Sequence, residues 1–178
     1  RVRCFQVFSF AVLPPEPVLQ DFKNIECRDA VLEYEPASDA PPKKAAWPKA
    51  DIVVGNPPFL GKLRIISGLG EQYAAALRAT YEGSVPDSAD FVMYWWHLAA
   101  CALAAGEITR FGFVSTNSIL QVFNRRVVAA ALEGDPPVSI VFAIPDHPWV
   151  DSENGASVRI AMTVASQGRS EEHTSELQ

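Results

Sequence analysis

Four consecutive residues, Asn56 to Phe59, carry the acceptors and the backbone restraints that could hold an exocyclic amine for reaction. The side-chain carbonyl of Asn56 is a hydrogen-bond acceptor. Pro57 leaves its own carbonyl free and fixes its φ at about −65°. Because Pro58 stiffens the same turn, both acceptors can be held at one point before a substrate arrives, as electrostatic catalysis requires.

The same turn predicts the chemistry. Two acceptors that converge on one NH₂ group would hold both of its hydrogens and favour a tetrahedral nitrogen with an exposed lone pair. Phe59 offers a flat face on which a planar base can stack. No strong base is needed beforehand, because the proton can leave after the transfer. We therefore expect alkylation of an amine on a planar ring. The alternative is a Pro-rich turn that only ends a strand.

The elements around the turn predict its position in the fold. Residues 52–54 form a continuous β-branched run, which suits a strand buried on both faces of a parallel sheet. In open α/β sheets, ligands bind beyond the carboxyl ends of the strands. Two more polar clusters are expected at such ends: Asp29 after a strand at 24–27, and residues 115–118 after a strand at 111–114.

Strand and helix patterns alternate along the rest of the chain. Periodicity predicts a helix over 71–81. Apolar runs bounded by turn residues predict helices over 90–105 and 125–132, strands over 138–144 and 157–165, and a strand or buried segment over 4–13. Asp87 is expected to cap the second helix, and Gly106 to end it. Two strands follow each other only at the end, so the order predicts an α/β fold with a doubly wound, mostly parallel sheet and a terminal antiparallel hairpin.

Two segments are predicted to lack regular structure. Residues 35–50 are rich in Pro, Ala, Asp and Lys, which is typical of a surface connection. Glycines at 61, 68 and 70 predict a mobile loop around Lys62 and Arg64. Such a loop could bring Lys62 to a phosphate group; the alternative is a solvated surface charge.

Composition narrows the class of protein. The 178 residues fit one domain, and 48% apolar with 20% charged residues suit a packed soluble domain. The longest apolar run, 91–105, is shorter than the roughly 20 residues of a membrane span, so no membrane partner is expected. A net charge of −6 argues against a broad basic surface for nucleic acid, although a small basic face remains compatible with it. Three scattered cysteines lack metal-ligand spacing and suit a reducing cytoplasm.

Longer motifs carry a family resemblance. The segments 56–61 (NPPFLG), 81–96 (YEGSVPDSADFVMYWW), 111–119 (FGFVSTNSI) and 148–163 (PWVDSENGASVRIAMT) resemble the large DNA adenine methyltransferases of the MmeI-like type, found in restriction-modification and phage-defence systems. The resemblance implies a class I enzyme with a Rossmann-like methyltransferase sheet and S-adenosyl-L-methionine as cofactor. It implies methyl transfer to the N6 amine of an adenine flipped out of double-stranded DNA.

The resemblance also implies residue roles. Asn56, Pro57, Pro58 and Phe59 would contact the target adenine. Asp29 takes the place of the acidic residue that contacts the cofactor adenine, although the family more often has a Gly-Asp pair where this chain has Arg28-Asp29. The family's Gly-rich cofactor loop is expected upstream of residue 1, and a recognition or nuclease domain elsewhere in a longer chain.

Other polar and aromatic residues leave alternatives open. Asn117 either supports the site from behind or caps a turn, and Trp149 either stacks on the flipped base or packs as a lid or core aromatic. The aromatic run at 94–96 is expected in the core, and His97 is expected to be a structural residue. The tail, 169–178, differs in composition and is expected to be non-native, which leaves 1–168 as a partial catalytic domain.

The sequence is also compatible with two alternatives to DNA adenine methylation. The same turn could methylate RNA adenine, the N4 amine of DNA cytosine, or a glutamine amide in a protein. The chain could instead be a non-catalytic module that only binds, because the cofactor loop is not found in its sequence.

Overall fold

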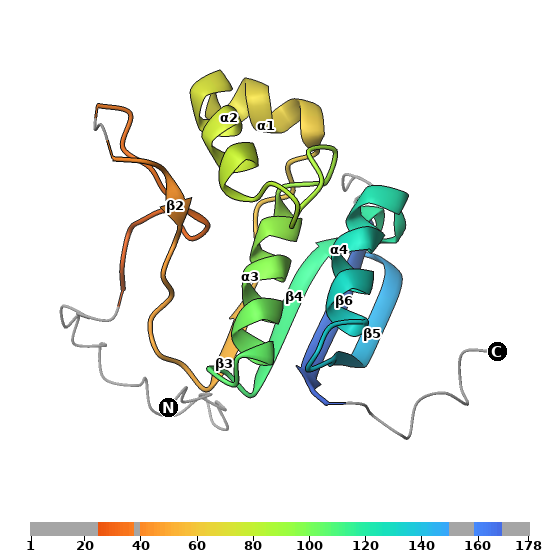
Figure 1. Ribbon diagram of the computed structural model, residues 1–178. Coiled ribbons are helices and arrows are strands. Elements are labelled where there is room, and N and C mark those ends of the chain that lie inside the picture. The colour runs from red at the N-terminus through yellow and green to blue at the C-terminus, as the bar shows by residue number, and fades with distance from the viewer. Residues whose placement is uncertain (1–24, 38–39, 150–158, 169–178) are drawn as a thin grey trace, which may run out of the picture.

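The computed structural model describes residues 25–37, 40–149 and 159–168 of the chain. Its elements are β1 (Leu32–Glu33), β2 (Lys43–Lys44), β3 (Ile52–Gly55), α1 (Lys62–Leu69), α2 (Glu71–Thr80), α3 (Val92–Ala104), β4 (Arg110–Thr116), the 3₁₀ turn η1 (Asn117–Leu120), α4 (Val122–Leu132), β5 (Val138–Pro148) and β6 (Arg159–Gln167). Figure 1 shows α3 and α4 in front of a sheet, with α1 and α2 beyond one end. The predictions for residues 4–13 and 169–178 lie outside the described residues.

In the described part of the chain, the main sheet has four strands in the order β3-β4-β6-β5. β3 runs parallel to β4, with Val53 opposite Phe111. β6 lies antiparallel to both of its neighbours, β4 and β5. The predicted antiparallel hairpin is therefore confirmed as β5–β6. A mostly parallel arrangement is not confirmed. β6 lies between β4 and β5 and is antiparallel to both, so β3 and β4 form the one parallel pair among these four strands.

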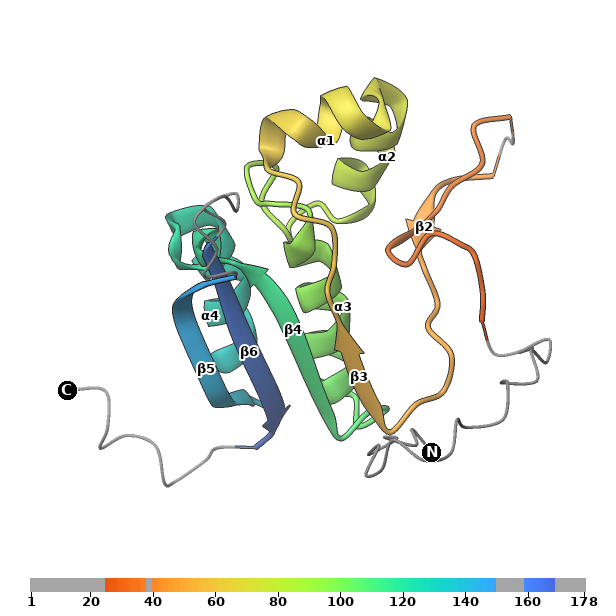
Figure 2. The ribbon, with the colours of Figure 1, turned by 180° about the vertical axis from the view of Figure 1, so that it is seen from behind.

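Helices α3 and α4 cover one face of this sheet, and Figure 2 shows the sheet in front of them from the other side. The side chains of β4 alternate, and Phe111 and Phe113 are buried under the helices. On β3, in contrast, Ile52 is 56% and Val54 is 80% exposed. The prediction that this strand is buried on both faces is wrong, because no described helix covers the face that carries Ile52 and Val54.

Helix α3 forms the centre of the core. Trp96 is fully buried, stands edge-on against Phe111 at 5.1 Å between ring centroids, and donates its indole N–H to Thr163 Oγ1 at 3.2 Å. Tyr94 is buried as well, and burial raises the pKa of its phenol to about 12. The prediction that the aromatic run packs in the core is confirmed for these two residues, whereas Trp95 between them is half-buried. Gly106 follows the helix with a φ of 73°, as a glycine stop predicts.

The segment before β3 corrects one prediction. Residues 25–27 form no strand, and the first described strand is β1, which pairs antiparallel with β2. Asp29 lies before β1, and its Oδ1 accepts the N–H groups of Val31 (2.8 Å) and Leu32 (3.0 Å). This side-chain turn leads the chain into β1. The predicted surface connection at 35–50 contains the exposed strand β2.

Residues 62–69 form helix α1 where a mobile loop was predicted. The helix buries Ile65, which is 1% exposed. Burying such a side chain contributes about 1.5–3 kcal/mol, which exceeds the cost of about 1 kcal/mol for Gly68 inside the helix. Gly70, with a φ of 90°, separates α1 from α2, and α2 confirms the helix predicted over 71–81.

The later elements start or end a few residues from their predicted limits. α4 begins at Val122 instead of 125, β4 extends to Thr116, and β5 extends to Pro148. Residues 117–120, predicted as loop, form η1. Within the described ranges, no helix has the length and apolar composition needed to cross a bilayer.

Candidate functional site

The turn at Asn56–Phe59 follows the carboxyl end of β3, next to the carboxyl end of the parallel strand β4. Pro57 is buried, Asn56 and Pro58 are exposed, and Phe59 is half-buried. Gly55, the last residue of β3, packs closely against Phe113. A Cβ on Gly55 would lie 3.2 Å from Cε1 of Phe113. The missing side chain lets the end of β3 rest directly on the ring of Phe113, which fixes where the turn begins.

We expect Gly55→Ala to destabilise the chain by about 1–3 kcal/mol, because the added methyl group must displace the buried Phe113 ring. Urea denaturation followed by circular dichroism measures this change. Gly61→Ala is the matched control, since its Cβ would meet only Asp90 Oδ1, at 3.5 Å. Equal unfolding midpoints for the two variants would show that the packing of Gly55 on Phe113 does not contribute to the free energy of unfolding.

Asn56, Pro57 and Pro58 line a hollow of about 320 Å³ together with Trp47 and Trp95. The hollow therefore combines the acceptor-bearing turn with two large aromatic side chains. Phe113 and Gly55 form part of the same wall. This is the arrangement expected of a site for a flat, partly polar ligand, which needs apolar area and a few fixed polar groups.

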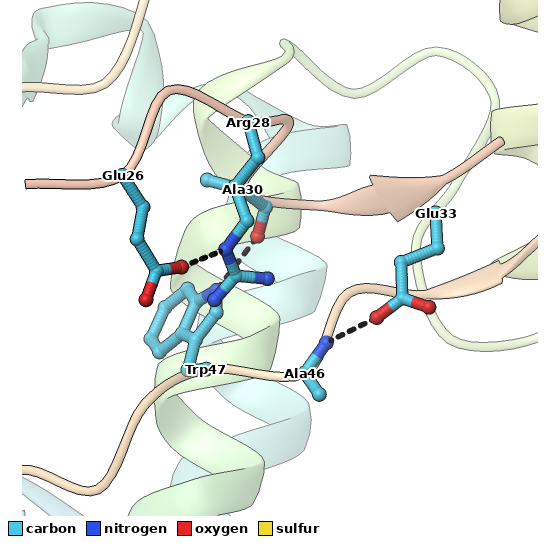
Figure 3. A network of polar contacts seen from close by, with 6 residues as sticks. All are labelled: Glu26, Arg28, Ala30, Glu33, Ala46 and Trp47. Carbon is cyan, nitrogen blue, oxygen red and sulfur yellow. Dashed lines mark hydrogen bonds and ion pairs between the residues drawn. The ribbon is translucent and has the colours of Figure 1, made fainter.

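Trp47 is held in place by the segment that precedes β1. Its indole N–H donates to the carbonyl of Ala30 at 2.6 Å, and Glu33 accepts the N–H of Ala46 at 3.2 Å (Figure 3). Sequence reasoning did not identify Trp47 or Trp95 as site residues. Trp95 lies on a helix that is apolar nearly all round, so no face could be distinguished, and Trp47 lies in a segment expected to be a surface connection.

A larger hollow of about 580 Å³ lies near the start of β3. Its lining includes Trp47 and Val53, which it shares with the smaller hollow, as well as Asp51 and Ile108. The Asn56–Phe59 turn takes no part in this lining. The smaller hollow is therefore the one that joins aromatic surface to the predicted reactive turn.

Asp29, the predicted cofactor residue, makes three hydrogen bonds within the protein. Besides its turn contacts, its Oδ2 accepts the hydroxyl of Tyr73 at 2.5 Å. Burial, followed by this contact with Asp29, raises the pKa of Tyr73 above its ordinary value. Ala30 lines the hollow and Asp29 is not among its lining residues. The cofactor contact of Asp29 stays a prediction, and the structure adds a structural role for the same carboxylate.

None of the three predicted substrate residues, Lys62, Asn117 and Trp149, is among the lining residues of the hollow. Lys62 Nζ donates to Ser88 Oγ at 3.3 Å, at the start of α1. Trp149 is 51% exposed and follows the end of β5. Phe59 is half-buried and is likewise not among the lining residues. Their roles toward a base or a phosphate stay predictions.

Asn117, the third, lies in a polar cluster at the far side of β4. Its side chain hydrogen-bonds to Asp146, whose Oδ1 also accepts from Nε of Arg159 at 2.5 Å. These contacts, that of Arg159 first, lower the pKa of the Asp146 carboxyl. Asn117 thus ties η1 to the β5–β6 hairpin, and its role toward a substrate stays a prediction.

His97 lies in a cluster outside the hollow. Its Nε2 is 3.1 Å from Nζ of Lys44 and 3.5 Å from Sγ of Cys101. Burial, and then the charge of Lys44, lower the pKa of His97 to about 4. This agrees with the prediction of a structural histidine. Among the described residues, no group of three or more His, Cys, Asp and Glu side chains could hold a metal ion.

The lowered pKa of His97 gives stability a definite pH dependence. Between about pH 6.5 and pH 4 the unfolded chain binds a proton at this residue and the folded chain does not. The free energy of unfolding therefore falls as the pH is lowered through this window. We expect His97→Gln to lose this part of the pH dependence, measured as urea midpoints at pH 7 and pH 4.5. Parallel pH profiles of the variant and the unchanged chain would contradict it.

Comparison with known proteins agrees with the motifs around the turn. A family model described as the DNA-methyltransferase domain of MmeI matches residues 7–177. No curated protein matches the chain. Among solved structures, the chain is similar to one described as the type IIL restriction-modification enzyme MmeI in complex with DNA, at 26% identity and a TM-score of 0.49. That match covers 67% of this chain and 16% of the other. Since the family model spans nearly the whole sequence, the chain belongs to the MmeI DNA-methyltransferase domain family.

Proposed function

We propose that the chain contains the catalytic turn of an enzyme that transfers a methyl group from S-adenosyl-L-methionine to the N6 amine of adenine in DNA. One observation carries this proposal: the Asn56-Pro57-Pro58 turn opens into a hollow that Trp47 and Trp95 also line. Membership of a DNA-methyltransferase domain family supports the reaction class. We place the reaction in a restriction-modification or phage-defence system and in the cytoplasm.

The turn would act on the amine through its two acceptors. The side-chain carbonyl of Asn56 and the backbone carbonyl of Pro57 accept the two amine hydrogens, and Pro58 keeps the turn stiff. With its hydrogens held in this way, the amine would direct its nitrogen lone pair at the methyl group that the cofactor supplies, and the amine proton would leave to solvent after the transfer. Phe59 stacks on the base. If the turn holds both acceptors before substrate binds, little reorganisation is required during the reaction.

The residues around the hollow fit the cofactor in kind. Trp47 and Trp95 present aromatic surface, which suits a planar ring and a positively charged sulfonium. Asp29, next to the lining residue Ala30, is the carboxylate proposed to accept from the amine of the cofactor adenine. The cofactor, when bound, supplies an electrophilic methyl group. The chain's own residues orient the acceptor amine beside it.

The DNA substrate must present its adenine outside the helix, because a stacked and paired base cannot reach the hollow. The chain carries a net charge of −6, so phosphate contacts on this chain would come from a small basic face. Lys62 at the start of α1 is the proposed member of that face, with Asn117 and Trp149 as further substrate residues. A recognition or nuclease domain in a longer natural chain would add affinity and sequence preference.

A methyl-transfer assay tests the proposal. Labelled S-adenosyl-L-methionine is incubated with either the chain or the longest natural protein that carries it, in parallel reactions with unmethylated bacterial DNA, RNA or protein, and the labelled nucleosides and amino acids are then separated. Label in N6-methyladenine of DNA is the expected result. Label in N4-methylcytosine, in RNA, or in protein glutamine would overturn the assignment of substrate. Tight binding of S-adenosyl-L-methionine by residues 1–168 alone, measured by calorimetry, would count against the alternative of a non-catalytic binding module.

A further inference from the structure

Asn124, on α4, is buried (2% exposed) and uses its whole side-chain amide on partners outside its helix. Its Oδ1 accepts the backbone N–H of Asp90 at 2.8 Å. Its Nδ2 donates to Oδ2 of Asp90 at 2.9 Å and to the carbonyl of Ser118 at 2.8 Å. A buried amide with three partners is costly to disturb, because each lost partner leaves a polar group unsatisfied.

The carboxylate of Asp90 is therefore held from two elements. Asn124 binds it from α4, and the hydroxyl of Ser118 in η1 donates to the same Oδ2. Asp90 lies just before α3, where the first N–H groups of a helix have no partner within it. Asp87 was expected to cap this helix, but α3 begins only at Val92 and no described side chain caps it; the N–H of Met93 donates to the backbone carbonyl of Asp90 at 3.0 Å.

Asp90 also adjoins the end of the reactive turn. The N–H of the next residue, Phe91, donates to the carbonyl of Leu60 at 2.8 Å, and the N–H of Leu60 donates to the carbonyl of Pro58 at 3.1 Å. A Cβ on Gly61 would lie 3.5 Å from Asp90 Oδ1. Pro57 and Pro58 have no N–H to donate. The Leu60–Phe91 bond therefore ties the carboxyl end of the turn to α3.

We propose that Asn124 is a positioning residue for the methyl transfer described above, acting through Asp90, Phe91 and Leu60 on the Asn56–Phe59 turn. It touches neither substrate nor cofactor. It fixes Asp90, so the N–H of Phe91 stays directed at Leu60 and the acceptors of the turn keep their place. The reactive role of the turn rests on the proposed function, whereas the tether itself does not. A misplacement of about 1 Å at such a site can cost on the order of 10²-fold in rate.

Asn124→Asp tests this with little change in volume. The new carboxylate has no donors for Asp90 Oδ2 and the Ser118 carbonyl, and it faces a like charge. We expect kcat for methyl transfer to fall about 10- to 100-fold, while KM for S-adenosyl-L-methionine changes less than kcat. In the 178-residue chain, we expect the amide hydrogen of Phe91 to exchange faster relative to that of Leu103, which is buried at the other end of α3, as measured by NMR.

Thr163→Val is the matched control. It removes the buried acceptor of the Trp96 indole and lowers stability at a site away from the turn. We expect its kcat and the relative exchange of Phe91 to stay at the unchanged values. If it lowers kcat as much as Asn124→Asp at equal stability, the effect is one of general destabilisation and the positioning role is overturned.

The outcomes separate this inference from the proposed function. Unchanged methyl transfer in Asn56→Ala overturns the proposed function, and the exchange of Phe91 still decides whether the tether exists. Loss of transfer in Asn56→Ala, with unchanged kcat and unchanged Phe91 exchange in Asn124→Asp, overturns the positioning role alone. If Asn124→Asp does not fold, Ser118→Ala removes one donor to Asp90, and the same two measurements decide in the same way.

Discussion

Asn56→Ala is expected to lower methyl transfer by about 10²–10³-fold, the loss typical of one preorganised hydrogen-bond partner in an active site. Asn56 is exposed at the carboxyl end of β3 and lines the hollow, so its removal changes the site without opening the core. Single-turnover methyl transfer, with enzyme in excess over DNA, measures the step itself. The unfolding midpoint is expected to stay within experimental error of the unchanged protein.

Two further variants sharpen this test. Asn56→Asp keeps an acceptor oxygen in the same place, and we expect it to retain more activity than the alanine variant. Gln72→Ala removes another exposed amide, on α2 and outside the hollow, and is expected to leave the rate unchanged. Methyl transfer at the wild-type rate by purified Asn56→Ala would contradict the two-acceptor mechanism.

Trp96→Ala is expected to lower the free energy of unfolding by about 3–5 kcal/mol, the range for losing a buried aromatic side chain. Trp96 is fully buried, packs edge-on against Phe111 and donates to Thr163. A typical domain is stable by only about 5–15 kcal/mol, so this one change removes a large share. Urea denaturation followed by far-ultraviolet circular dichroism measures it, since several tryptophans contribute to the fluorescence.

Trp95→Ala is the control for Trp96, because the neighbouring tryptophan is half-buried and lines the hollow. We expect it to destabilise less than Trp96→Ala and to weaken cofactor or substrate binding. A double-mutant cycle of Trp96→Phe with Thr163→Val separates the hydrogen bond from the packing. Equal destabilisation by the two alanine variants would contradict the expectation that the buried Trp96 contributes more to stability than the half-buried Trp95.

The sequence predicted those parts of the fold that depend on local patterns. The helix at 71–81 was found from its periodicity, and the helix at 90–105 from its long apolar run between Asp87 and Gly106. Helix α1 was missed because its glycines resemble loop punctuation, and only tertiary burial of Ile65 favours the helix. Strand β1 depends on contacts far along the chain, such as the Tyr81 hydroxyl that donates to the Val31 carbonyl at 2.6 Å.

Local patterns also misjudged which faces are covered. A β-branched run such as 52–54 indicates a strand, but it does not say how many faces other elements will cover. At the site, the sequence predicted Asn56, Pro57 and Pro58 because their chemistry is contained in one turn. It could not predict that Trp47 and Trp95 meet this turn, since they come from separate elements and converge only through the packing of the segment before β3 on α3.

The position of β6 in the sheet has a consequence for how the chain folds during synthesis. β4 finds its second neighbour only in β6, where Phe111 pairs with Ala165 and Thr116 with Ile160. β5 also pairs with β6 and not with β4. A nascent chain that ends before residue 159 therefore leaves an edge of both β4 and β5 without its partner strand. The ribosome must synthesise β6, the final strand of the described chain, before the β3–β4 pair and β5 can join into one sheet.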